Sequence, residues 1–335
     1  MTNDSIIYCT YFDKGYLLKG LSLHSSFVRH HPSASLWILC FDAYTYTVLS
    51  RLRLKNVTLI PLSQFEDSPL LVAKKNRSLV EYYWTCTPSL PLYLFRLNPK
   101  VQHVCYLDAD LYFFSNLIPV WQEFNGSSIY TVEHRFPPGQ ENRMYTSGRF
   151  NVGFQIFRRD RQGLACLRRW RQQCLDWCYW RLEDGKLGDQ LYLNEWPRLY
   201  SRLVISQNLG VNTAPWNIGQ YSISLQNDKP YIGNDELIFY HFHQLKISRP
   251  LKFDFASGYY LSRDVKKYIY TPYIRELKLH YNRVKKIDPT FSVPPSHTGF
   301  IKIPQWVASW AGPLFWKITL RITRRRPTFT PEFNP

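Results

Sequence analysis

The sequence predicts an α/β fold, in which a mostly parallel central sheet is flanked by helices and followed by a basic helical extension at the C-terminal end. Short apolar, β-branched runs alternate with stretches of helical periodicity over the first hundred residues. Parallel strands need a crossover connection, usually a helix, so this alternation is typical of a parallel sheet. After about residue 250 Lys, Arg and Tyr become frequent, which marks the extension.

The strands are predicted from apolar runs bounded by turn residues, and the helices from apolar residues at helical spacing. Pro88 and Pro91 interrupt one predicted helix, and a polar segment with two Pro, two Gly and three Arg, residues 134–149, is predicted to be a loop that moves as a lid. The predicted strands are 5–11, 36–41, 57–61, 103–107, 128–132, 151–157 and 240–243, and the predicted helices are 16–30, 44–53, 77–97, 160–183 and 263–287.

The composition favours an anionic partner without indicating a nucleic-acid-binding protein. The formal net charge is +17, and aromatic residues make up 17% of the chain. A basic protein attracts nucleic acid, an anionic membrane surface or a phosphorylated substrate. The chain has no zinc-finger spacing, no aromatic-basic RNA-binding signature and no recognition helix. We therefore expect no nucleic-acid partner.

The cysteines and the N-terminal end indicate a reducing compartment. Free cysteines in apolar stretches behave as small hydrophobic residues, so we expect the seven cysteines to belong to the core. The chain begins with a short polar segment that runs directly into a strand, and no apolar run approaches about 20 residues. We expect a cytoplasmic protein. The cysteines are Cys9, Cys40, Cys86, Cys105, Cys166, Cys174 and Cys178.

Residues 304–326 combine aromatic residues with a basic cluster, which is the composition of a helix that lies in a membrane interface. Gly312-Pro313 interrupts this segment. The alternative is a C-terminal helix that packs on the rest of the protein, and both interpretations stay open. The first would place the protein peripherally at the inner face of an anionic membrane.

Asp108-Ala109-Asp110 follows a buried strand that ends at Leu107. Ligands bind α/β sheets at the carboxyl ends of the strands. Two carboxylates one residue apart can hold a hard divalent cation, and such a cation neutralises a leaving diphosphate. A solvated loop would also explain the motif, but the apolar run before Asp108 argues against it.

Two histidines, His241 and His243, lie on a predicted strand after an apolar stretch. Alternate residues of a strand share a face, so both imidazoles can point at one site. A neutral imidazole completes an Asp/Asp/His set that suits Mn²⁺ or Mg²⁺. Lys246 follows closely and can pair with a diphosphate oxygen.

Five motifs occur in the order seen in one family. The chain resembles the Rossmann-like GT-A-fold glycosyltransferases that use nucleotide sugars, and is most similar to the retaining glycogenin-like family that includes bacterial lipopolysaccharide galactosyl- and glucosyltransferases. The motifs span about residues 5–250 and are TYFDKGYLLKG (10–20), YLDADLYFFSN (106–116), FNVGFQIF (150–157), GDQLYLN (188–194) and YHFHQLK (240–246).

The resemblance implies a role for several residues. Thr10 and Tyr16 would lie at the nucleobase, Tyr16 by stacking on it, and Asn151 would hydrogen-bond the donor sugar. Asp189 and Gln190 would lie beside the anomeric carbon, although an N-cap would also explain Asp189. In addition, Asp108 and Asp110 would hold the metal together with a histidine of the HFH run, Lys246 would contact the diphosphate, and Arg77 and Ala109 would contact the donor.

The last motif departs from the family pattern H-F-x-G-x-x-K-P-W, because it lacks the Gly and brings the Lys one place nearer. Either His241 or His243 can therefore be the metal ligand, and alignment favours His241. Trp216 is either a stacking platform for a sugar or a buried residue in a turn. Glu133-His134-Arg135 follows a predicted strand, but the sequence assigns it no mechanism.

These observations predict a metal-dependent hexosyltransferase that uses a nucleoside diphosphate sugar, with UDP favoured, and retains the configuration at the anomeric carbon. The acceptor would be a glycan or glycolipid of polysaccharide biosynthesis. Residues 1–250 would form the catalytic domain and 251–335 a basic, aromatic extension that associates with membranes. The alternatives are a non-catalytic module that binds polyanions or membranes and a sugar nucleotidyltransferase, which would usually have a Gly-rich loop after the first strand.

Overall fold

The computed structural model describes residues 6–249, 251–256 and 258–294. The segment 304–326, for which the sequence leaves a membrane helix and a packed helix open, lies outside the described residues.

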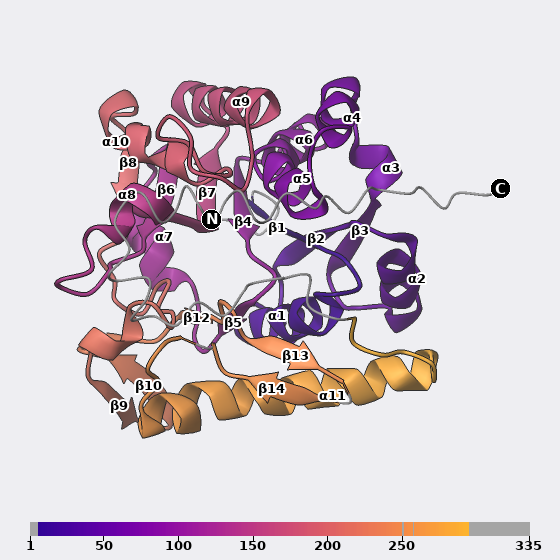
Figure 1. Ribbon diagram of the computed structural model, residues 1–335, viewed down its shortest axis with the longest axis vertical. Coiled ribbons are helices and arrows are strands. Elements are labelled where there is room, and N and C mark those ends of the chain that lie inside the picture. The colour runs from indigo at the N-terminus through magenta and orange to yellow at the C-terminus, as the bar shows by residue number, and fades with distance from the viewer. Residues whose placement is uncertain (1–5, 250, 257, 295–335) are drawn as a thin grey trace. The chain divides into compact units, whose positions relative to one another are not determined.

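A seven-stranded sheet forms the centre of the protein (Figure 1). Its first four strands in space are parallel, and β7 is antiparallel to both of its neighbours. β6 and β8 pair in parallel. In spatial order the strands are β3 (Val57–Pro61), β2 (Ser35–Cys40), β1 (Ile6–Phe12), β4 (His103–Leu107), β7 (Phe150–Arg158), β6 (Ile129–Glu133) and β8 (Leu203–Ile205).

Helices cover both faces of this sheet, as Figure 1 shows. Side chains of a strand alternate between the faces, so on β1 Tyr8 and Phe12 enter one apolar cluster while Ile7 and Cys9 enter the other. The first cluster is completed by α1 (Leu17–His30), α2 (Ala43–Leu52) and α11 (Thr271–Ile287), and the second by α5 (Leu79–Cys86), α6 (Ser89–Leu97) and α9 (Arg161–Asp176).

Shorter elements complete the structure at the edges of these layers. Residues 223–236 form a three-stranded sheet of their own, and two small pairs bring distant parts of the chain together. These elements are α3 (Leu62–Phe65), α4 (Ser68–Lys74), β5 (Leu111–Phe113), α7 (Ile118–Phe124), α8 (Arg143–Ser147), η2 (Leu191–Glu195), α10 (Trp196–Leu199), η3 (Ile218–Gln220), β9 (Ile223–Gln226), β10 (Lys229–Ile232), β11 (Asp235–Glu236), β12 (Phe239–His241), β13 (Lys246–Ser248), β14 (Lys252–Asp254) and η4 (Val265–Tyr270).

The structure confirms the predicted α/β fold with its mostly parallel sheet, and corrects some boundaries. The predicted helix 77–97 is divided between Cys86 and Ser89, and the predicted helix 160–183 ends at Asp176 because Trp177 has an extended backbone. The lid segment contains the short helix α8. The strand predicted for 240–243 ends at His241.

All seven cysteines are buried and unbridged, as expected for core residues. No helix within the described parts of the chain is long and apolar enough to cross a bilayer.

Candidate metal and nucleotide site

The two carboxylates lie where β4 ends, at one edge of the sheet. The backbone N–H of Asp108 donates to the carbonyl of Gly153 on β7, at 2.9 Å. After the turn, β5 pairs antiparallel with β12, and Leu111 stands opposite His241. The N–H of Phe242 then donates to the carbonyl of Asp110, also at 2.9 Å. This pairing brings His241, which lies 131 residues after Asp110, to the carboxylates.

Asp108, Asp110 and His241 form a compact group of possible metal ligands. Their ligand atoms all lie within 4.8 Å of one another, and the described part of the chain contains no second group of this kind. The Nε2 atom of His241 is 3.2 Å from Asp110 Oδ1 and 3.7 Å from Asp108 Oδ2. Two carboxylates and one imidazole suit Mn²⁺ or Mg²⁺, so the residues present fit the metal that the sequence predicts.

Neighbouring groups hold two of these ligands in place. The hydroxyl of Tyr106 donates to Asp108 Oδ1 at 2.7 Å. The ring of His241 lies against the backbone of Gly153, where a Cβ atom would come within 2.8 Å of the His241 Cε1 atom. A glycine is therefore required on β7 for the imidazole to reach the carboxylates.

Lys19 adds a cation to this group. It lies in the first turns of α1, and its Nζ atom is 3.5 Å from Asp110 Oδ2 and 4.2 Å from the centre of the Tyr16 ring. The lysine is only 6% exposed. Lysine is seldom buried unless it is paired, and both contacts provide such a partner.

The charges at the site set the protonation of its members. Burial alone would raise the pKa of Asp110, but Lys19 and His241 lower it below its usual value. Burial raises the pKa of Asp108, against the opposing effect of His241. Burial alone would lower the pKa of His241, but the two aspartates raise it above its usual value in the metal-free protein.

Asn151 and Gln190 form a hydrogen-bonded unit behind the carboxylates. The Oε1 atom of Gln190 accepts from the Asn151 side chain and from the N–H of Val152, both at 3.2 Å. Its Nε2 atom donates to the carbonyl of Ser147, and the Oδ1 atom of Asn151 accepts from the N–H of Gly153. The orientations of both amides are therefore fixed.

Asp189 is a buried carboxyl close to the metal group. Burial, opposed by a hydrogen bond from Thr87 and assisted by the charge of Asp108, raises its pKa to about 7. The helix that follows, Leu191–Glu195, begins after Gln190 without a side-chain cap. Asp189 is thus not an N-cap, the alternative that the sequence left open.

Three histidines surround Trp216. Its ring contacts those of His134, His241 and His243 edge-on, with centroids 5.1–5.3 Å apart. Its indole N–H donates to the carbonyl of His134 at 2.9 Å. Because Trp216 is only 5% exposed, its position favours the buried interpretation over an open stacking platform. His243 lies beyond the end of β12 and outside the compact ligand group.

The pKa values of His134 and His243 shift in the opposite direction from that of His241. Burial, with a smaller effect of His241, lowers the pKa of His243 to about 3. Burial likewise lowers the pKa of His134 to about 3. The Nδ1 atom of His134 lies 2.9 Å from the carbonyl of Gly148, which can only accept, so Nδ1 carries the proton. Its Nε2 atom is then an acceptor and faces the Asn151 amide at 3.4 Å.

The residues predicted at the nucleobase differ in accessibility. Tyr16 is 44% exposed at the start of α1, and its N–H donates to Asp13 Oδ1 at 3.1 Å. Thr10 is fully buried on β1, and its hydroxyl has no hydrogen-bond partner among the described residues. Ala109, between the two aspartates, is 6% exposed.

Arg77 and Lys246 lie in surrounding elements. Arg77 follows α4, where its guanidinium donates to the carbonyl of Leu175 and stacks over the Tyr179 ring at 3.9 Å. These contacts attach it to the end of α9. Lys246 begins β13, which pairs with β14.

Four residues near the Asp108/Asp110/His241 group could not be assigned a role from the sequence. Lys19 reads as a solvent-facing lysine of an amphipathic helix, and Tyr106 and Gly153 read as ordinary strand residues. His134 was noticed without a mechanism. A signal existed only for Lys19, because it lies three residues after Tyr16 and so shares its helix face.

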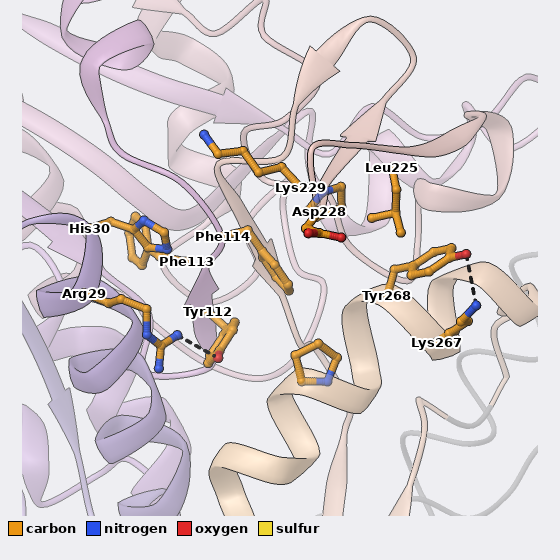
Figure 2. A pocket seen from close by; sticks show the side chains of 12 residues that line it. Arg29, His30, Tyr112, Phe113, Phe114, Leu225, Asp228, Lys229, Lys267 and Tyr268 are labelled. Atoms are coloured by element: carbon orange, nitrogen blue, oxygen red, sulfur yellow. Dashed lines mark hydrogen bonds between the residues drawn. The ribbon is translucent and has the colours of Figure 1, made fainter.

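A separate cavity of about 300 Å³ lies between the end of α1, β5, the β9–β10 hairpin and the start of α11 (Figure 2). Its cations already have acidic or phenolic partners: Arg29 pairs with Glu276, Lys229 with Glu236, and Lys267 with the hydroxyl of Tyr268. None of the three possible metal ligands lines it. The carboxylate edge is therefore the candidate site.

Comparison with known proteins places the chain among bacterial relatives. The uncharacterized protein YfnF of Bacillus subtilis (strain 168) is 32% identical over 247 residues, which cover 72% of this chain and 82% of that protein. The chain belongs to the family of YfnF. A second protein of the same organism, the uncharacterized protein YfnD, is 29% identical over 288 residues, 85% of this chain and 93% of its own length. No model of a known protein family matches the chain.

Among solved structures, the galactosyltransferase LgtC in complex with donor and acceptor sugar analogues has a similar fold. The TM-score is 0.51 at 14% identity, and the match covers 82% of this chain and 95% of LgtC. The predicted GT-A fold is thereby confirmed. At this identity the likeness concerns the fold alone.

Proposed function

We propose that this chain is a metal-dependent glycosyltransferase that moves a hexose from a nucleoside diphosphate, first of all UDP, to a glycan or lipid-linked acceptor with retention of configuration. The observation that carries the proposal is the Asp108/Asp110/His241 group at the carboxyl end of a GT-A sheet. In such a site a divalent cation supplies charge that stabilises a departing diphosphate.

Different residues of the chain bind the cation, the diphosphate and the nucleobase. Asp108, Asp110 and His241 hold the cation, and Lys246 contacts the diphosphate. Tyr16 offers an exposed ring on which a nucleobase stacks, at the end of the strand that carries Thr10. Arg77 and Ala109 contribute further donor contacts.

The polar unit behind the carboxylates receives the donor sugar. The fixed amides of Asn151 and Gln190 present hydrogen-bonding groups without having to reorder, and Asp189 lies beside them. A buried carboxyl with a pKa of about 7 is suited to orienting an acceptor hydroxyl or to stabilising positive charge at the anomeric carbon. We propose residues 251–335 as the part that brings the protein to an anionic membrane surface.

The test is a panel of nucleotide sugars incubated with the full chain. Nucleoside diphosphate release, with and without added MnCl2 and with excess EDTA, identifies the donor and the metal requirement. We expect manganese-dependent release from at least one UDP-hexose. Binding of polyanions without metal, and no release from any donor, would instead support a non-catalytic basic module.

A further inference from the structure

Lys19 is a buried positive charge in a site built to hold a cation. Its ammonium group has two neighbours, Asp110 Oδ2 at 3.5 Å and the ring of Tyr16 at 4.2 Å. The role of a metal ligand is excluded for it, because a protonated lysine has no free electron pair. Its presence beside the ligands therefore needs another explanation.

The carboxylate of Asp110 is shared between two partners. Its Oδ1 atom faces His241 Nε2 at 3.2 Å, and its Oδ2 atom faces Lys19. Lys19 thus leaves Oδ1 accessible to a cation. The lysine and a metal can occupy the site together, and each acts on the other through its charge.

The charge balance shows the direction of this effect. With His241 neutral, as a ligand must be, Asp108 and Asp110 contribute two negative charges and Lys19 one positive charge. A divalent cation would then leave the site with an excess positive charge that a nucleoside diphosphate neutralises. Without Lys19 the two aspartates alone would balance the cation.

We propose that Lys19 couples the metal to the nucleotide: it weakens binding of the divalent cation to the nucleotide-free site, and the diphosphate removes this penalty. The proposal rests on the proposed function, since it assumes a nucleoside diphosphate ligand. Coupling between two ligands is reciprocal, so the metal must strengthen nucleotide binding by the same factor. At several ångströms in a partly buried site, one unit charge changes the affinity by about 10- to 100-fold.

The experiment measures Mn²⁺ binding to the full chain by electron paramagnetic resonance of free Mn²⁺, with and without saturating UDP. In the wild type we expect weak binding that UDP tightens by at least about 10-fold. Lys19→Met should bind Mn²⁺ alone about 10- to 100-fold more tightly, with little further tightening by UDP. Lys19→Arg keeps the charge and should retain the wild-type coupling.

Lys14→Met is the matched control, because Lys14 lies in the same segment but over the Tyr44 ring, at 4.1 Å. It should leave Mn²⁺ affinity unchanged. Lys19→Gln replaces Lys19→Met if the methionine variant does not fold. A variant that binds Mn²⁺ alone no more tightly than the wild type overturns the inference, since Lys19 would then only position Asp110. If UDP does not bind the wild type even with Mn²⁺, the proposed function fails instead.

Discussion

The three histidines around Trp216 lie in two different environments. His241 faces two carboxylates, which raise its pKa, whereas burial keeps His134 and His243 neutral. Asp108, Asp110 and His241 therefore form a charged corner that fits a cation. Trp216, His134 and His243 form a neutral, aromatic wall whose polar atoms suit uncharged hydroxyl groups, such as those of a sugar. Contacts made within a few ångströms thus determine the direction in which the pKa of each histidine shifts.

The largest effect should come from the charged corner. Asp108→Asn removes one of the two negative charges that would hold the proposed cation, so donor turnover should fall by about 1,000-fold or more. The assay is nucleoside diphosphate release with excess Mn²⁺. Asp176→Asn, at an exposed position at the end of α9, is the control and should keep its activity. Near-normal turnover of the Asp108 variant would show that Asp108 is not a metal ligand needed for turnover.

The neutral wall should respond through stability rather than charge. Trp216→Ala removes a buried ring that contacts three imidazoles, which should lower the free energy of unfolding by about 3–5 kcal/mol. Trp216→Phe keeps most of the ring and removes one of two donors to the His134 carbonyl, which still accepts from the Asn217 amide, so it should cost only about 0.5–1.5 kcal/mol. Urea denaturation measures both. An unchanged free energy of unfolding in the alanine variant would show that the Trp216 ring does not stabilise the fold.

Asp189 tests the cost of a buried charge next to the charged corner. Its raised pKa means that the folded protein holds a proton that the unfolded chain has already lost between pH 4 and 7, so ionisation of Asp189 destabilises the fold as pH rises. Asp189→Asn should therefore gain stability relative to the wild type from pH 4 to pH 8. A shift from 3.8 to about 7 corresponds to about 4 kcal/mol at most.

Urea denaturation of the metal-free wild type and of Asp189→Asn at several pH values measures the difference in their free energies of unfolding. The stability difference should be smallest near pH 4 and level off above pH 8. Parallel stability curves over this range would mean that the Asp189 carboxyl ionises as readily in the folded protein as in the unfolded chain.

The smallest effect is expected for His134 and His243, whose protonation should not change with pH near neutrality. In metal-free protein, NMR titration of the imidazole signals should show no protonation of His134 and His243 between pH 5 and 8, while His241 titrates above the usual histidine range. His243→Gln identifies its signals. Titration of His243 near pH 6.5 would show that burial does not keep this imidazole neutral, and the neutral wall would then not differ in charge from the charged corner.

Local patterns were sufficient for much of the sheet. Runs such as VTLIP at 57–61 and HVCYL at 103–107 are apolar, short and bounded by turn residues, so they read as strands. β5 could not be found in this way, because it is three residues long and continues directly from the acidic turn. The hairpin at 223–232 carries exposed polar residues that resemble a loop.

The candidate site was predictable where function depends on residue type, and less so where it depends on packing. Two aspartates after a strand are visible in any sequence. The choice between His241 and His243 depends on the end of β12 and on Gln244, whose φ of 58° belongs to a turn. The burial of Lys19 follows from contacts between α1 and a carboxylate 91 positions away, which no local pattern contains.

Helix α11 has a consequence for where this protein can be shortened. Tyr273 of α11 stacks on Phe242, with ring centroids 3.8 Å apart, and Phe242 stands between His241 and His243. His280, further along α11, hydrogen-bonds Ser25 of α1, the helix that carries Lys19. A chain that stopped at residue 250 would lose this backing, so limited proteolysis should release no stable fragment ending there. Helix α11, which lies beyond residue 250, supports the site from behind. The smallest part of the protein that folds on its own therefore has to include this helix.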